Sequence, residues 1–228
     1  MIDYSGKIIT PGLVDTHVHY PQITMISEYG EQLIGWLNTY TFPTEIKYSN
    51  HAYASQEASV FLDQLVKNGT TTALVFATRS PVSVDAFFEQ ALKRNMRMIS
   101  GKVLMDRNAL AELLDTPQSA YDESKALIEK WQHKGRLDYA VTPRFAPTST
   151  DDELTIAGKL LKQFPDVYLH THLAENNRIF VVLDPQAGQV LAGRNKETKS
   201  IEEQLFGMEM SGDARTVTHT YVMGTKMK

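Results

Sequence analysis

Apolar runs with the pattern of β-strands alternate with amphipathic segments that have the pattern of α-helices through the first three quarters of the chain. The strand-like runs are short, whereas apolar residues recur at helical spacing in the segments between them. The predicted strands cover residues 7–10, 13–17, 71–76, 98–104, 137–142 and 168–172, and the predicted helices cover residues 51–68, 82–95, 121–133 and 151–164. This alternation predicts an α/β fold with a parallel sheet.

Polar residues collect where the predicted strands end, at His17, Asp106, Arg144 and His172. Such a distribution is typical of a (β/α) barrel whose active site lies at the C-terminal ends of its strands. Only about five barrel strands can be counted, so we predict an incomplete (β/α)8 TIM-type barrel. The two open edges of such a sheet would favour association, so a homo-oligomer is possible.

The pattern changes beyond Asn177, where we place a domain boundary. An apolar run at 179–183 is followed by a Pro- and Gly-containing turn and a second run at 190–192, which predicts a β-hairpin. A helix at 200–208 and a final strand at 218–222 are predicted after it.

Charge and cysteine content restrict the chemistry. The chain has 23 basic and 27 acidic residues in an interspersed pattern, so we expect neither nucleic acid nor an anionic membrane as a partner. No cysteine is present, which leaves histidine and carboxylates as candidate metal ligands. The sequence has no signal peptide pattern and no membrane-spanning run, and a cytoplasmic location is expected.

Two His-x-His pairs lie at the ends of the first and fifth barrel strands. Because alternate strand residues share a face, His17 and His19 can converge on one ion, although two such histidines are as often half-exposed strand residues. Asp15 is a plausible orienting group. One histidine of the pair His170 and His172 could complete a three-ligand set that leaves a position open for water.

Several motifs resemble the guanine deaminases of the amidohydrolase superfamily. The match is nearly continuous from residue 6 to residue 176, and it is most specific in three places. These are Tyr-Pro-Gln at 20–22, Leu-Asn-Thr-Tyr-Thr-Phe-Pro at 37–43 and Pro-Arg-Phe at 143–145. The segments that carry the resemblance are 11–22, 29–33, 36–45, 69–73, 101–108, 142–148 and 170–176.

The resemblance implies roles for individual residues. It implies that the metal ligands are His17, His19 and His172, with Glu175 as the proton shuttle, and it does not extend to His170. The implied purine contacts are Gln22, Arg144 and Phe145. The implied reaction is hydrolysis of guanine to xanthine and ammonia by a metal-bound hydroxide, with one Zn²⁺ ion and Fe²⁺ as the other possibility.

By the same resemblance, residues 178–228 are similar to the C-terminal part of the small β domain of these enzymes. Residues 11–177 then form the partial barrel, and residues 1–10 are a remnant of the small β domain. The histidine of barrel strand six and the aspartate of strand eight have no counterpart, so this chain alone is expected to be impaired. Two alternatives stay open: a non-catalytic remnant or oligomerisation fragment, and a deaminase of another amino-heterocycle.

Overall fold

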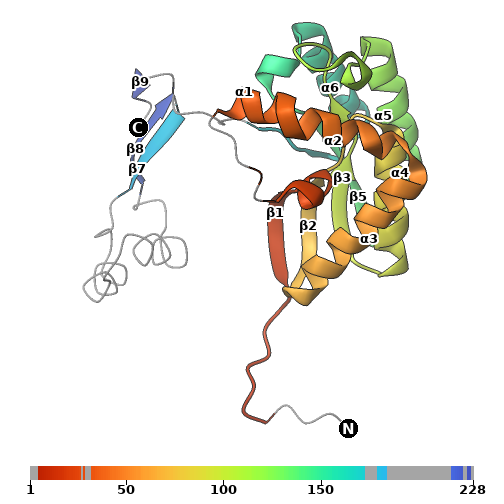
Figure 1. Ribbon diagram of the computed structural model, residues 1–228, viewed down its shortest axis with the longest axis vertical. Coiled ribbons are helices and arrows are strands. Elements are labelled where there is room, and N and C mark those ends of the chain that lie inside the picture. The colour runs from red at the N-terminus through yellow and green to blue at the C-terminus, as the bar shows by residue number, and fades with distance from the viewer. Residues whose placement is uncertain are drawn as a thin grey trace. The chain divides into compact units, whose positions relative to one another are not determined.

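The computed structural model describes residues 5–26, 28, 32–172, 179–183, 217–222 and 225–226. The chain forms two compact units, residues 1–173 and residues 174–228 (Figure 1). None of the described helices is both long and apolar enough to cross a membrane.

The first unit is built on a parallel sheet. Its strands are β1 (Leu13–His19), β2 (Thr70–Phe76), β3 (Arg97–Gly101), β4 (Val103–Leu104), β5 (Leu137–Pro143) and β6 (Tyr168–Leu169). β1 pairs with β2, β2 with β3, and β5 with β3, β4 and β6, always in parallel. Because only Lys102 separates β3 from β4, these two form one interrupted strand. The predicted five-stranded parallel arrangement is therefore confirmed.

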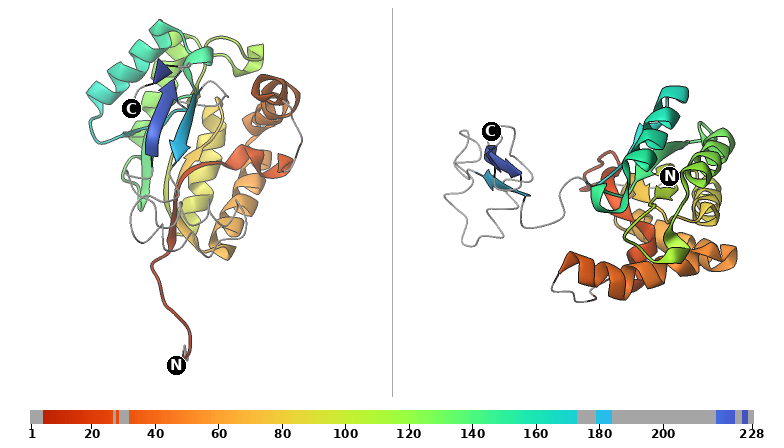
Figure 2. Two further views of the ribbon diagram at one scale, coloured as in Figure 1. Left: turned by 90° about the vertical axis from the view of Figure 1, so that its left-hand side faces the viewer. Right: turned by 90° about the horizontal axis from the view of Figure 1, so that it is seen from above.

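Four helices cover one face of this sheet, as Figures 1 and 2 show. They are α3 (His51–Lys67), α4 (Pro81–Lys93), α5 (Pro117–Trp131) and α6 (Asp151–Gln163). Side-chain caps begin three of them, because Asn50, Thr116 and Thr150 each accept a hydrogen bond from a backbone N–H of the first turn. Between helices and sheet lies an apolar core that includes Phe87 and Phe88, both fully buried.

Two regions differ from the sequence prediction. Residues 7–10 do not form the predicted strand, and Ile8 and Ile9 are exposed. Their local β propensity has no partner strand among the described residues to satisfy it. Conversely, residues 33–49 form unpredicted helical turns: α1 (Leu33–Trp36), a π-helical turn (Leu37–Thr41), α2 (Phe42–Ile46) and a 3₁₀ turn (Lys47–Ser49). Each of these turns is too short to show helical periodicity, and Pro43 is typical of a break in a helix, so the sequence pattern did not predict them.

The two outer strands expose apolar side chains. Within the described part of the chain, β1 pairs only with β2 and β6 only with β5. Leu13 and Val14 on β1 and Tyr168 and Leu169 on β6 are all exposed. Both free edges therefore present unpaired backbone groups beside apolar side chains, as an open parallel sheet requires.

The second unit contains a small antiparallel sheet. β7 (Ile179–Leu183) pairs with β8 (Val217–Val222), which pairs with β9 (Thr225–Lys226). β8 thus lies where a final strand was predicted at 218–222, and the unpredicted β9 follows it. The described partner of β7 is β8, whereas the predicted return strand at 190–192 and the predicted helix at 200–208 lie outside the described residues.

Close contact between β3 and β5 requires glycine at position 101. A Cβ at Gly101 would lie 1.7 Å from the Ala140 carbonyl oxygen. We expect Gly101→Ala to lower the free energy of unfolding by about 3 kcal/mol in urea denaturation, the upper end of the usual cost of overpacking. Gly158 in α6 is the matched control, because a Cβ there meets nothing within 4 Å. Gly158→Ala should stabilise the chain by about 0.5–1 kcal/mol, and equal stability of Gly101→Ala and wild type would contradict the close approach.

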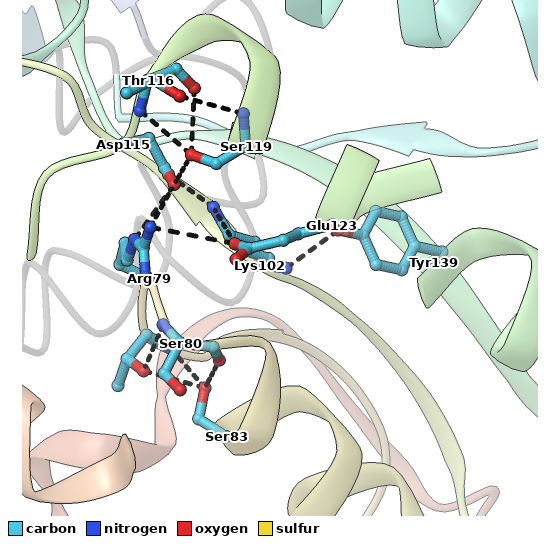
Figure 3. Close-up of polar contacts among 10 residues, drawn as sticks. Arg79, Ser80, Ser83, Lys102, Asp115, Thr116, Ser119, Glu123 and Tyr139 are labelled. Carbon is cyan, nitrogen blue, oxygen red and sulfur yellow. Dashed lines mark hydrogen bonds and ion pairs between the residues drawn. The ribbon is translucent and has the colours of Figure 1, made fainter. Parts of the chain in front are cut away.

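A buried cluster of charges surrounds Lys102 at the interruption between β3 and β4 (Figure 3). The fully buried Lys102 ammonium pairs with Asp115 and lies 3.4 Å from a carboxylate oxygen of Glu123. The Arg79 guanidinium lies 3.0 Å from the other Asp115 oxygen, to which the Ser119 hydroxyl also donates. Two cations and two carboxylates therefore balance one another around the fully buried Lys102–Asp115 pair, so the cluster is a structural element.

Asp115 is the centre of this cluster, and its loss should be costly. In Asp115→Ala, the buried Lys102 and the partly exposed Arg79 would lose their main counter-charge. We expect the free energy of unfolding to fall by about 3–5 kcal/mol, as is usual when one partner of a buried ion pair is removed. Urea denaturation measures this. Asp63→Ala, which breaks the exposed ion pair with Arg94, should change stability little, and a similar loss in both variants would contradict the role of Asp115.

Candidate functional site

Four histidines from the two outer strands meet at the C-terminal ends of the strands. β1 carries His17 and His19, and His170 and His172 follow β6. His17 Nδ1 lies 3.0 Å from His170 Nε2, and His19 Nε2 lies 2.9 Å from His172 Nε2. Because β1 and β6 are opposite edges of one sheet, these contacts require the sheet to curve until its ends face each other, as in half of a barrel.

Three of these histidines form a group that could hold a metal ion. One ring nitrogen from each of His17, His19 and His172 lies within 4.8 Å of the others. Two zinc-bound nitrogens at tetrahedral angles are about 3.3 Å apart, so the 2.9 Å between His19 and His172 needs only a slight widening. The His19 Nδ1 atom is buried and has no hydrogen-bond partner in the described part of the chain. The arrangement fits a divalent cation.

The site keeps its imidazoles neutral, which is the form that binds metal ions. Burial lowers the pKa of His19 well below its ordinary value, and the charge of Arg144 lowers it further. Burial also lowers the pKa of His172 to about 4 and that of His170 to about 3. The pKa of His17 is lowered by burial, with Asp15 opposing the shift. Protons therefore compete weakly for these nitrogens near neutral pH.

The orientation of His172 is fixed by the backbone of Arg144. The His172 Nδ1–H group donates to the Arg144 carbonyl oxygen over 2.8 Å, and the His172 backbone N–H donates to the same oxygen over 3.0 Å. This contact selects the tautomer whose Nε2 lone pair is available for a metal ion. Sequence reasoning did not identify this carbonyl, because backbone partners leave no residue-type signal.

Phe76, the last residue of β2, packs against the histidines. Its ring is stacked on His19 with centroids 4.5 Å apart and on His172 with centroids 4.2 Å apart. An apolar ring under the imidazoles limits their movement and keeps water from that side. The final position of a buried strand next to the His17 strand was the only sequence signal for this role.

The predicted purine contact Arg144 is deeply buried. Its Nη1 donates to both carboxylate oxygens of Glu45 over 2.9 Å, and its guanidinium carbon lies 5.3 Å from the centre of the Phe42 ring. Glu45 and Phe42 lie on α2, a segment whose helical structure was not predicted. Glu45 itself was not assigned any role from the sequence, although it lies in one of the motifs that carry the resemblance.

A cavity of about 360 Å³ is lined by Phe42 and by the predicted contact Phe145, whereas the predicted contact Arg144 is not among its lining residues. The ring centroids of Phe145 and His172 are 6.5 Å apart, so the cavity wall and the histidine group are neighbours. Its volume lies in the range of small-ligand pockets.

The other predicted residues lie elsewhere. Gln22 is half-buried on the 3₁₀ turn Tyr20–Met25, which follows His19 directly, and it is not among the residues that line the cavity. Asp106 accepts hydrogen bonds from the backbone and hydroxyl of Thr150 and so supports the start of α6. Glu175 lies outside the described residues.

The family model described as "Amidohydrolase family" matches residues 8–187. The chain belongs to the amidohydrolase family. A group of histidines at the C-terminal ends of parallel strands is therefore the expected place for the chemistry of this amidohydrolase.

The relatives of this amidohydrolase include guanine deaminases, which confirms the resemblance found in the sequence. The guanine deaminase of Escherichia coli K12 is 58% identical over 174 residues, which cover 76% of this chain and 40% of that relative. The guanine deaminase structure from Bradyrhizobium japonicum has a TM-score of 0.72 at 44% identity, with coverage of 73% and 36% of the two chains.

A third relative was solved with guanine in its active site. This guanine deaminase of C. acetobutylicum has a TM-score of 0.71 at 29% identity, and the match covers 87% of this chain and 46% of that one. The predicted α/β half-barrel fold is confirmed by these structures. This amidohydrolase spans about 40% of the length of the first curated relatives it matches.

Proposed function

We propose that this chain binds guanine and hydrolyses it to xanthine and ammonia, with His17, His19 and His172 holding one Zn²⁺ ion. The observation that carries the proposal is the convergence of the three histidines within 4.8 Å, beside a cavity of ligand size. Fe²⁺ is the other ion that these ligands suit. A divalent ion bound there would lower the pKa of water and supply a nucleophile near neutral pH.

The chain's own groups have distinct roles in this proposal. Phe145 flanks the purine ring, Arg144 donates hydrogen bonds to a purine carbonyl oxygen, and Gln22 both donates to and accepts from a purine edge. Glu175 takes the proton from the attacking water and delivers it to the leaving amine. Phe76 excludes water from one side of the histidines.

Guanine turnover tests the proposal. The purified chain, loaded with one equivalent of zinc, is expected to convert guanine to xanthine, followed by ultraviolet absorbance and by ammonia release. Absence of xanthine despite bound zinc would contradict the proposed activity of this chain. Parallel assays with other amino-purines and amino-triazines test the alternative that the substrate is another amino-heterocycle.

A second candidate function, a non-catalytic association module, is favoured by the exposed apolar residues on both free sheet edges. Two such edges can pair with edges of other copies. Light scattering during gel filtration measures the mass of the particle. A multimer without turnover would favour this function, and a monomer with turnover would exclude it.

A further inference from the structure

Glu45 and Arg144 form an ion pair that is almost completely removed from water. The Glu45 side chain is 1% exposed and the Arg144 side chain is 3% exposed. The two residues are 99 positions apart in the sequence, and Arg144 Nη1 donates to both oxygens of the carboxylate over 2.9 Å. The pair therefore joins α2 to the end of β5.

Three contacts together fix the Arg144 guanidinium. The first is the double hydrogen bond to Glu45, and the second is the Phe42 ring at 5.3 Å. Phe42 and Glu45 are three residues apart on α2, which places them on the same side of that helix. The third is the Arg144 backbone, which donates to the Leu104 carbonyl oxygen over 3.1 Å and accepts from His172.

Arg144 keeps hydrogen-bond donors that Glu45 does not use. Among the described residues, the hydrogen bonds of its guanidinium all come from Nη1, and an arginine also has N–H groups on Nε and Nη2. Phe42, which contacts the guanidinium, and Phe145, the next residue in the chain, both line the 360 Å³ cavity. Arg144 also contacts the histidine group directly, since its carbonyl oxygen accepts hydrogen bonds from His172 Nδ1 and from the His172 backbone N–H.

A buried ion pair of this kind contributes little net free energy to the stability of the fold. Removing both charges from water costs about as much as their attraction returns, and an apolar pair of the same size often stabilises a protein more. Burial indeed raises the pKa of Glu45 above its ordinary value, although Arg144 opposes the shift. The pair is better explained by a need to hold a guanidinium in one orientation.

We propose that Glu45 is a positioning residue that fixes Arg144 so that its free N–H groups recognise the carbonyl oxygen of a purine base. This inference rests on the proposed function. It adds a specificity determinant: the site prefers a purine with a carbonyl group over the same ring without one. The Arg144 carbonyl oxygen also orients His172. Arg144 would therefore contact the purine carbonyl oxygen through its guanidinium and position a proposed metal ligand through its backbone.

Binding to the metal-free chain tests this without turnover. The fluorescent base 2-aminopurine, which has no carbonyl oxygen, is titrated into the chain in EDTA, and guanine is then used to displace it. We expect the wild type to prefer guanine. In Glu45→Gln, guanine should bind about 10- to 100-fold more weakly, the loss expected for a hydrogen bond from a charged group, whereas the affinity for 2-aminopurine should change less than about twofold.

Two further variants separate positioning from folding. Glu45→Asp keeps the charge but shortens the side chain, so it should fold even if Glu45→Gln does not, and it should lose part of the guanine preference. Glu89→Gln, at an exposed ion pair with His51, should bind both bases as the wild type does. Binding of neither base by the wild type would overturn the proposed function together with this inference. A folded Glu45→Asp or Glu45→Gln with the full guanine preference would overturn this inference alone.

Discussion

Replacement of His172 by alanine is expected to abolish metal retention. His172 and His19 present their Nε2 atoms to each other at 2.9 Å, so removal of His172 leaves two ligands on one strand and opens the opposite side. The affinity for zinc should fall by more than the roughly 10- to 100-fold that loss of a supporting residue costs. The measurement is zinc content by mass spectrometry after dialysis, together with competition against a zinc-binding dye.

Two other histidine variants test whether the loss of zinc is specific to His172. His51→Ala removes a half-exposed histidine that pairs with Glu89 and should retain zinc as the wild type does. His170→Ala should show an intermediate loss, because His170 supports His17 through a contact of 3.0 Å but is not in the three-residue group. Wild-type zinc content in His172→Ala would show that the ion binds elsewhere.

The strand and helix pattern could be predicted because it depends on local periodicity. Each barrel strand from Leu13 onward was found near its predicted place, and the parallel pairing follows from the helix between each pair of strands. The meeting of His17 and His19 with the pair His170 and His172 was also predictable, since the C-terminal ends of strands in a closed or half-closed parallel sheet point to one place. The choice of His172 within that pair came only from the resemblance to guanine deaminases. Alternation along β1 then selects which side chains share that face.

The contacts that refine the site could not be predicted in this way. The Glu45–Arg144 pair joins two segments 99 residues apart, and nothing in the local sequence of either residue specifies its partner. The helical turns that carry Glu45 are short and contain Pro43, and their stability comes from the burial of Leu37, Phe42 and Tyr48. Tertiary packing, which a periodicity analysis does not include, therefore determines how Arg144 is held.

Glu175→Gln is expected to separate metal binding from turnover. Glu175 follows His172 by three residues, and its role as the proton shuttle is part of the proposed function. Glutamine has nearly the same size but cannot accept a proton, so the chain should retain zinc and bind guanine while its rate of xanthine formation falls about 10²- to 10⁴-fold, the usual contribution of a general acid–base group. The rate is measured at saturating guanine and over a range of pH, with zinc content determined on the same samples.

The outcome for Glu175 is distinguishable from a loss of the metal site. His172→Ala should lose zinc and turnover together, whereas Glu175→Gln should lose turnover alone. Glu129→Gln, at a surface ion pair with Lys125 on α5, is the matched control and should leave the rate unchanged. A rate in Glu175→Gln within about tenfold of the wild type would be too high for the loss of the shuttle. In that case another group transfers the proton.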